Sequence, residues 1–152
     1  METIATLELQ AALKDLEGIR QFITQTCEAM AISADTLYHF NLAVTELVTN
    51  TILYGYKEQP GRIFIEILRQ GGDLVIRIRD EAPFFDPTQV PPPDFSIPLE
   101  ERPPGGWGIY LSRQIMDRFT HRELAGGGNE ITLIMENVIS AAKEEQENGD
   151  RD

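Results

Sequence analysis

Prolines are concentrated in one stretch of this chain. Eight of the nine prolines lie between residues 81 and 104. Proline fixes φ and has no N–H group, so neither a helix interior nor a central strand can run through this stretch. The pattern predicts a long irregular loop. Loops of this length inside a compact domain usually serve a function or are disordered.

Before this loop, residues 35–56 carry the strongest helical pattern of the chain. Apolar and small side chains recur there at spacings of three and four, which predicts one long amphipathic helix with a buried stripe: Leu37, Phe40, Val44, Leu47 and Thr51. Ser33 or Asp35 can cap the start of this helix, and the stretch 55–61, which contains Pro60, ends it.

Glu46 and Asn50 lie on a neighbouring stripe of the same predicted helix. They are four residues apart, so their side chains stack on one face and can reach one object beside the helix. A pair of this kind can simply line a solvated face. Alternatively, the carboxylate can accept a proton, and the amide oxygen can ligate a hard cation such as magnesium.

The other predicted elements define the fold class. Residues 3–9 alternate as an edge strand, and residues 11–31 have helical spacing. Two hairpins pair 62–70 with 74–80 and 119–124 with 131–136, and a further helix begins near 108. This order predicts an α+β fold, a two-layer α/β sandwich with helices on one face of a mostly antiparallel sheet.

Asp80 ends an otherwise apolar row in the second strand of the first hairpin. Leu74, Ile76, Ile78 and Asp80 project to one face, which is the face expected to meet the helices. A buried carboxylate is costly unless something hydrogen-bonds to it. Asp80 can therefore be either the cap of the following turn or a ligand-binding group.

The proline-rich loop leads into Gly105-Gly106-Trp107-Gly108 and an apolar helical run. A glycine-rich turn that opens a helix presents backbone N–H groups to an anion, and the helix dipole favours negative charge there. The pattern indicates a phosphate-binding turn, although glycines also occur in plain turns.

Composition and charge exclude several classes. At 152 residues the chain predicts one domain, and its net charge of −12 argues against nucleic acid and against an anionic membrane surface. A single cysteine, Cys27, fits a reducing cytoplasm, where it would pack in the core. His39 and His121 lack metal-ligand spacing, so we expect surface roles. Residues 137–152 form an acidic tail after a domain at 1–136.

Four motifs, in order, resemble those of one superfamily. TELVTNTILYGY resembles its N-box, IRDEAPFFDP and RPPGGWGIYLSRQIMDRF resemble its two glycine boxes, and GGGNEITL resembles its closing hairpin. The sequence looks like the nucleotide-binding domain of gyrase, heat-shock chaperones, histidine kinases and mismatch-repair ATPases. Within that superfamily it most resembles the bacterial anti-sigma factor serine/threonine kinases, over roughly residues 5 to 136.

The resemblance implies roles for individual residues in a Bergerat-type ATP-binding fold. Glu46 matches the general base, Asn50 the magnesium ligand, and Asp80 the acid that accepts a hydrogen bond from the adenine amino group. The phosphate loop is matched by Gly105, Gly106 and Gly108, and Arg102 is the cationic candidate beside it, with a solvated loop arginine as the other interpretation.

The sequence also departs from the family pattern at three places. Ala82 stands where the first glycine box usually has glycine, and Tyr54 stands where many relatives have histidine. Asn129-Glu130 replaces a threonine-rich pair, which removes an expected polar contact.

By resemblance, the protein is a cytoplasmic kinase that uses ATP and Mg2+. It would phosphorylate an anti-sigma factor antagonist of the STAS type and sequester a sigma factor by partner switching, and it could form a homodimer. The alternative is a non-catalytic, nucleotide-responsive module that binds protein partners. A histidine kinase would also need a phosphoacceptor helical hairpin, for which this chain leaves no room.

Overall fold

The computed structural model describes residues 1–89, 91–101 and 107–140. The described residues form five strands and three α-helices, in the chain order β1 (Glu2–Gln10), α1 (Leu16–Ala29), α2 (Ala34–Asn50), β2 (Arg62–Gln70), β3 (Asp73–Asp80), α3 (Trp107–Ile115), β4 (Arg118–Glu123) and β5 (Asn129–Met135).

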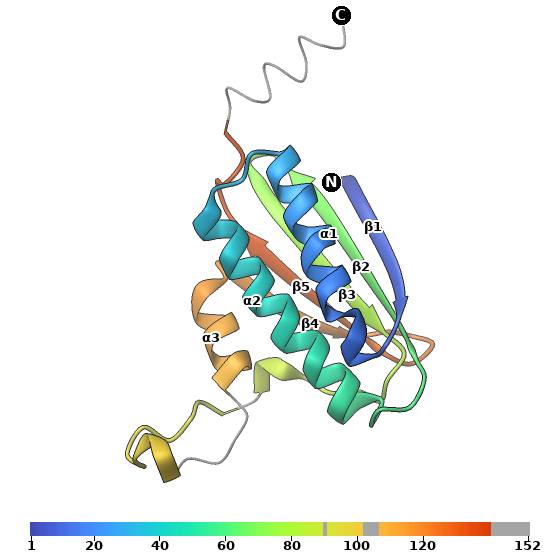
Figure 1. Ribbon diagram of the computed structural model, residues 1–152, viewed down its shortest axis with the longest axis vertical. Coiled ribbons are helices and arrows are strands. Elements are labelled where there is room, and N and C mark those ends of the chain that lie inside the picture. Colours follow the sequence, from blue (N-terminus) through green and yellow to red (C-terminus); the bar gives the residue numbers. More distant parts are fainter. Residues whose placement is uncertain (90, 102–106, 141–152) are drawn as a thin grey trace, which may run out of the picture.

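The strands form one sheet in the order β1-β2-β3-β5-β4, and every neighbouring pair is antiparallel. Figure 1 shows α1 and α2 lying across one face of this sheet, with α3 beside α2. The α+β class and the two-layer sandwich predicted from the sequence are confirmed. The strand predicted near the N-terminus is β1, and it lies at the edge of the sheet as expected.

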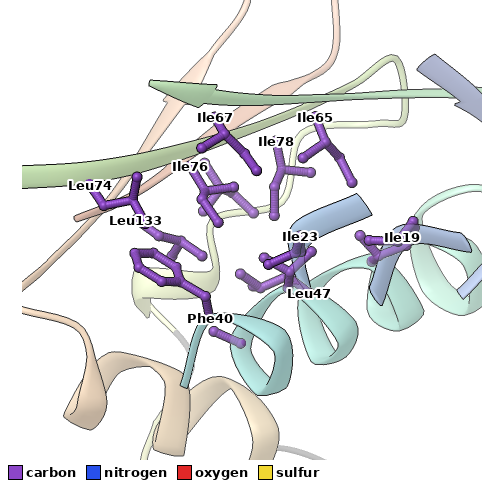
Figure 2. Packing of buried hydrophobic residues seen from close by; sticks show 14 of the residues in the cluster. Ile19, Ile23, Phe40, Leu47, Ile65, Ile67, Leu74, Ile76, Ile78 and Leu133 are labelled. Atoms are coloured by element: carbon purple, nitrogen blue, oxygen red, sulfur yellow. The ribbon is translucent and has the colours of Figure 1, made fainter. Parts of the chain in front are cut away.

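The core lies between the helices and the sheet. In Figure 2, Ile23 and Leu47 from the helices face Ile76 and Ile78 of β3, and all four side chains are buried. The predicted alternation is therefore correct, because the register pairs Ile65 with Ile78 and keeps both on the helix-facing side. Cys27 packs in this core, and burial raises the pKa of its thiol to about 11.

The long predicted helix changes its winding near its end. Ser33 caps α2 by accepting a hydrogen bond from the backbone N–H of Thr36, as the sequence allowed. After Asn50 the chain continues as a wider π-helical turn over Thr51–Gly55. Turns of this type occur often at functional sites.

The proline-rich loop is irregular in its described parts apart from two short 3-10 turns, Pro87–Gln89 and Leu99–Glu101. Figure 1 shows the segment 91–101 standing away from the sheet. It is linked to α3 by aromatic contacts, because the Phe95 ring lies 5.4 Å from that of Trp107 and 5.6 Å from that of Tyr110, centroid to centroid.

The chain beyond β5 stays attached to the domain through residue 139. The backbone N–H groups of Val138 and Ile139 both donate to the carbonyl of Gly72, and Ile139 is buried. The boundary at 136 stays a prediction, and the tail predicted to follow it lies outside the described residues from 141 onward. Within the described part of the chain, no helix is long and apolar enough to cross a membrane.

Candidate functional site

A cavity of about 480 Å³ opens where the C-terminal end of α2 meets the ends of β3 and β5. Its walls are largely apolar, with a few polar groups among them: Leu47, Asn50, Thr51, Tyr54, Gly55, Asp80, Ala82, Pro83, Phe84, Phe85, Pro87, Ile109, Asn129 and Ile131. A largely apolar pocket of this size with a few convergent polar groups is typical of small-molecule sites.

Three of the residues singled out from the sequence meet in this cavity. Asn50 reaches it from the last turn of α2, Asp80 from the end of β3, and Ala82 from the chain that follows. Glu46 does not belong to the cavity lining. It lies one turn earlier on α2, half-buried, and its carboxylate occupies the space that a Cβ on Gly108 would need.

Asp80 is a buried carboxylate, with only 4% of its surface exposed. Its Oδ1 accepts a hydrogen bond of 2.9 Å from the backbone N–H of Ala82 and another of 2.9 Å from Nδ2 of Asn129. Neither of these two hydrogen bonds uses Oδ2, and the backbone N–H of Asn129 is a further group that favours the ionised carboxylate. Burial raises the pKa of Asp80, and the hydrogen bonds from Asn129 and Ala82 offset part of this effect.

Sequence reasoning gave Asn129 no role in the site, whereas the structure shows that its side chain makes several polar contacts. It lies directly opposite Asp80 in the β3–β5 register. Its Nδ2 donates to Asp80 and, at 3.1 Å, to the carbonyl of Pro83. Its Oδ1 accepts from the backbone N–H of Phe85 at 3.0 Å. The amide therefore joins the sheet to the rim of the cavity.

His121 is also placed differently from the prediction of a surface role. Its side chain is only 4% exposed, because the alternation of β4 turns it to the same face as Ile131, its partner in the register. Nε2 lies 2.8 Å from Oδ1 of Asn129, and Nδ1 lies 3.6 Å from a carboxylate oxygen of Asp86. Asp86 itself stabilises a turn, since its carboxylate accepts hydrogen bonds from the backbone N–H and the hydroxyl of Thr88.

Ala82 takes a position where the family pattern has glycine, and the structure accommodates its methyl group. Ala82 is buried, and a Cβ added at Gly55 would lie 3.1 Å from the Cβ of Ala82. The missing side chain at the end of the π-helical turn therefore leaves the room that Ala82 uses. Nearby, the hydroxyl of Tyr56 accepts from the N–H of Glu81 and donates to the carbonyl of Arg62, which fixes the chain just after Asp80.

The other predicted phosphate-binding residues are only partly described. Arg102, Gly105 and Gly106 lie outside the described residues. Gly108 lies in the first turn of α3, and its carbonyl accepts a hydrogen bond from Ser112. In the described part of the chain, no three acidic, histidine or cysteine side chains gather as a metal site. A cation bound here would therefore depend on Asn50 together with oxygens of a ligand and water.

Comparisons with known proteins identify the family of this chain. The model of the histidine kinase-like ATPase domain matches residues 9–135. The serine-protein kinases RsbW of Bacillus cereus (strain AH820) and Bacillus thuringiensis (strain Al Hakam) are each 31% identical over 123 residues, 77% of this chain and 77% of theirs. The crystal structure of the RsbU and RsbW domains of Rv1364c from Mycobacterium tuberculosis superposes with a TM-score of 0.59 at 16% identity, covering 87% of this chain and 32% of that one.

This chain therefore belongs to the histidine kinase-like ATPase family. The similarity to the RsbW serine-protein kinases confirms the resemblance to anti-sigma factor kinases that the motifs indicated. The structural match supports the fold.

Gly128 provides a test of how the site is built. It has φ +101°, and an added Cβ would collide with the backbone carbonyl of Asp80. We expect Gly128→Ala to lower the free energy of unfolding by about 2 kcal/mol or more, because the strained φ adds to a backbone clash. Gly126→Ala is the matched control, since its Cβ would meet nothing within 4 Å. Equal urea denaturation midpoints for the two variants would contradict this packing.

Asp80→Asn tests the cost of the buried charge without ligand. The asparagine carbonyl can accept the same two hydrogen bonds. Because the folded pKa of Asp80 is raised, the stability contributed by its protonated form is lost as the pH rises through that pKa. We expect the neutral variant to gain stability relative to the wild type at pH 7, and the difference to shrink toward zero below the ordinary pKa of 3.8. Thermal unfolding at both pH values measures it, and a difference that is independent of pH would contradict the assignment.

Proposed function

We propose that this protein is an ATP-dependent serine/threonine protein kinase that acts as an anti-sigma regulatory factor. Its substrate would be an anti-sigma factor antagonist of the STAS type, and it would sequester a sigma factor by partner switching in the cytoplasm, as a monomer or homodimer. The observation that carries the proposal is the convergence of Asn50 and Asp80 on one cavity in a chain related to RsbW kinases.

The chemistry of the cavity fits an adenine nucleotide. Asp80 lines the cavity, and its hydrogen bonds with Ala82 and the Asn129 side chain use Oδ1, so Oδ2 can accept a hydrogen bond from the exocyclic amino group of adenine. Ala82 and Ile131 supply apolar surface for the base. Asn50 would then ligate Mg2+, which neutralises phosphate charge when bound. Arg102, Gly105 and Gly106 remain proposed contacts of the phosphates.

Glu46 is proposed as the general base. It would accept the proton of the substrate serine hydroxyl as the phosphoryl group is transferred. Its position one turn from Asn50, against Gly108 of α3, puts it beside the cavity, where a protein substrate could enter. The second candidate function is the non-catalytic module, which is favoured by the fact that Glu46 does not line the cavity itself. The kinase needs Glu46 to accept a proton, whereas the non-catalytic module does not.

Nucleotide binding is the first experimental requirement. We expect millimolar Mg-ATP to raise the melting temperature of the wild type, because a ligand that binds only the folded state stabilises it. Asp80→Asn should abolish this increase, because the NH₂ group of the asparagine would face the adenine amino group. Both groups are hydrogen-bond donors, so no hydrogen bond can form between them. A wild-type melting temperature that does not respond to Mg-ATP would remove the nucleotide from the proposal.

The catalytic role of Glu46 has its own test. We expect Glu46→Gln to lower phosphoryl transfer from radiolabelled ATP to a candidate antagonist protein by about 10²- to 10⁴-fold, the range for loss of a general base. The affinity for ATP should change little. Glu28→Gln, on the exposed side of α1, is the control. Unchanged transfer by the Glu46 variant, or no transfer by the wild type to any antagonist, would favour the non-catalytic module.

A further inference from the structure

We propose that Asn129, with His121 behind it, determines the base specificity of the cavity by holding Asp80 as an acceptor for 6-aminopurine nucleotides. This inference rests on the proposed nucleotide-binding function. Neither residue would act on the phosphates. Asn129 is a specificity-determining residue, and His121 is a positioning residue that acts through it, since it does not belong to the cavity lining.

The surroundings of Asn129 dictate which way its amide points. The side-chain oxygen accepts from the backbone N–H of Phe85 at 3.0 Å and lies 2.8 Å from Nε2 of His121, which donates in the tautomer that carries its proton on Nε2. The NH₂ group faces acceptors, Oδ1 of Asp80 at 2.9 Å and the carbonyl of Pro83 at 3.1 Å. A flipped amide would place its NH₂ group against the N–H of Phe85 and its oxygen against the Asp80 carboxylate and the Pro83 carbonyl, so these three groups fix the orientation.

This orientation decides how Asp80 is used. Oδ1 accepts hydrogen bonds from the Asn129 side chain and from the N–H of Ala82, and the backbone N–H of Asn129 also favours the ionised carboxylate. They fix the plane of the carboxylate and leave Oδ2 as an acceptor. Charge-assisted bonds to the ionised form also work against the effect of burial, which favours the protonated form. A protonated Asp80 could donate to a base carbonyl and would not discriminate for an amino group.

His121 holds the amide in place from the far side. Its side chain is buried between Asn129 and the turn at Asp86, and no apolar residue at this position could donate to the amide oxygen. Without that donor, one of the two contacts of the amide oxygen is lost. The remaining donor, Phe85, lies on the rim of the cavity.

Comparison of ATP with ITP measures this effect apart from general stability. The two nucleotides share ribose and phosphates, but ITP carries a carbonyl where adenine carries its amino group. We expect the wild type to bind Mg-ATP at least tenfold more tightly than Mg-ITP. With ITP the buried Asp80 carboxylate would face a carbonyl oxygen and lose its hydrogen bond to the base. We expect Asn129→Ala to reduce this ratio to about threefold or less, measured by isothermal titration calorimetry.

The His121 variants test the positioning role. His121→Leu should reduce the ATP-to-ITP ratio toward that of Asn129→Ala, whereas His121→Gln, which keeps a donor near the amide oxygen, should restore most of it. Leu68→Ala is the control, because Leu68 is buried in the small cluster with Val75 and Ile134, apart from the cavity-lining residues. It should lower stability and leave the ratio unchanged.

The outcomes separate this inference from the function on which it rests. If the wild type binds neither nucleotide, the proposed function fails. If it binds both equally, or if the Asn129 and His121 variants keep the wild-type ratio, the specificity role is overturned while nucleotide binding stands. If Asn129→Ala does not fold, the ATP-to-ITP ratios of the two His121 variants test the specificity role. These variants change the contact between His121 and the Asn129 amide and leave the cavity lining intact.

Discussion

The site depends on one buried carboxylate and the groups that make its burial tolerable. A charge removed from water is costly unless it is hydrogen-bonded, and a protein selected for stability alone would place a neutral side chain at the end of β3. Asp80 is instead surrounded by residues that stabilise or accommodate it. Asn129 donates to it across the sheet, Gly128 leaves room beside its carbonyl, and Tyr56 fixes the residue that follows it.

The residues around Asp80 come from three parts of the chain that are distant in sequence. The π-helical turn after α2 and the residue that follows it contribute Gly55 and Tyr56. The strand β3 contributes Asp80 itself, and the β4–β5 hairpin contributes Asn129 and its neighbours. The antiparallel register brings Asn129 next to Asp80, which pairs with Ile63 on its other side. Gly55 and Tyr56 reach the same region through their contacts with Ala82 and Glu81. The fold therefore creates the cavity at the point where β3 leaves the sheet and the proline-rich loop begins.

Much of this arrangement follows from local sequence patterns. Alternation along β3 placed Asp80 on the helix-facing side, and helical spacing placed Asn50 on the face that reaches the cavity. Asn129 and His121 were missed because their roles depend on the pairing of strands, which a single strand does not specify. The sequence nevertheless contained a pattern that could have found them. If the hairpin turn ends at Gly128, strand alternation puts Asn129, Ile131 and His121 on one face of the sheet.

Glu46 shows a second limit of sequence reasoning. Its spacing from Asn50 correctly puts both residues on one side of the helix, yet only Asn50 lines the cavity, because α3 packs over the preceding turn and Gly108 lies against the Glu46 carboxylate. The spacing of residues along a helix determines on which side their side chains lie. Whether a side chain reaches a cavity depends also on the elements that pack over that side of the helix.

The structure of the protein with Mg2+ and a non-hydrolysable ATP analogue tests the central claim most directly. The account predicts that the adenine amino nitrogen lies about 3 Å from Oδ2 of Asp80, with Oδ1 still bonded to Asn129. An adenine bound elsewhere, or an Asp80 carboxylate turned away from the base, would contradict it.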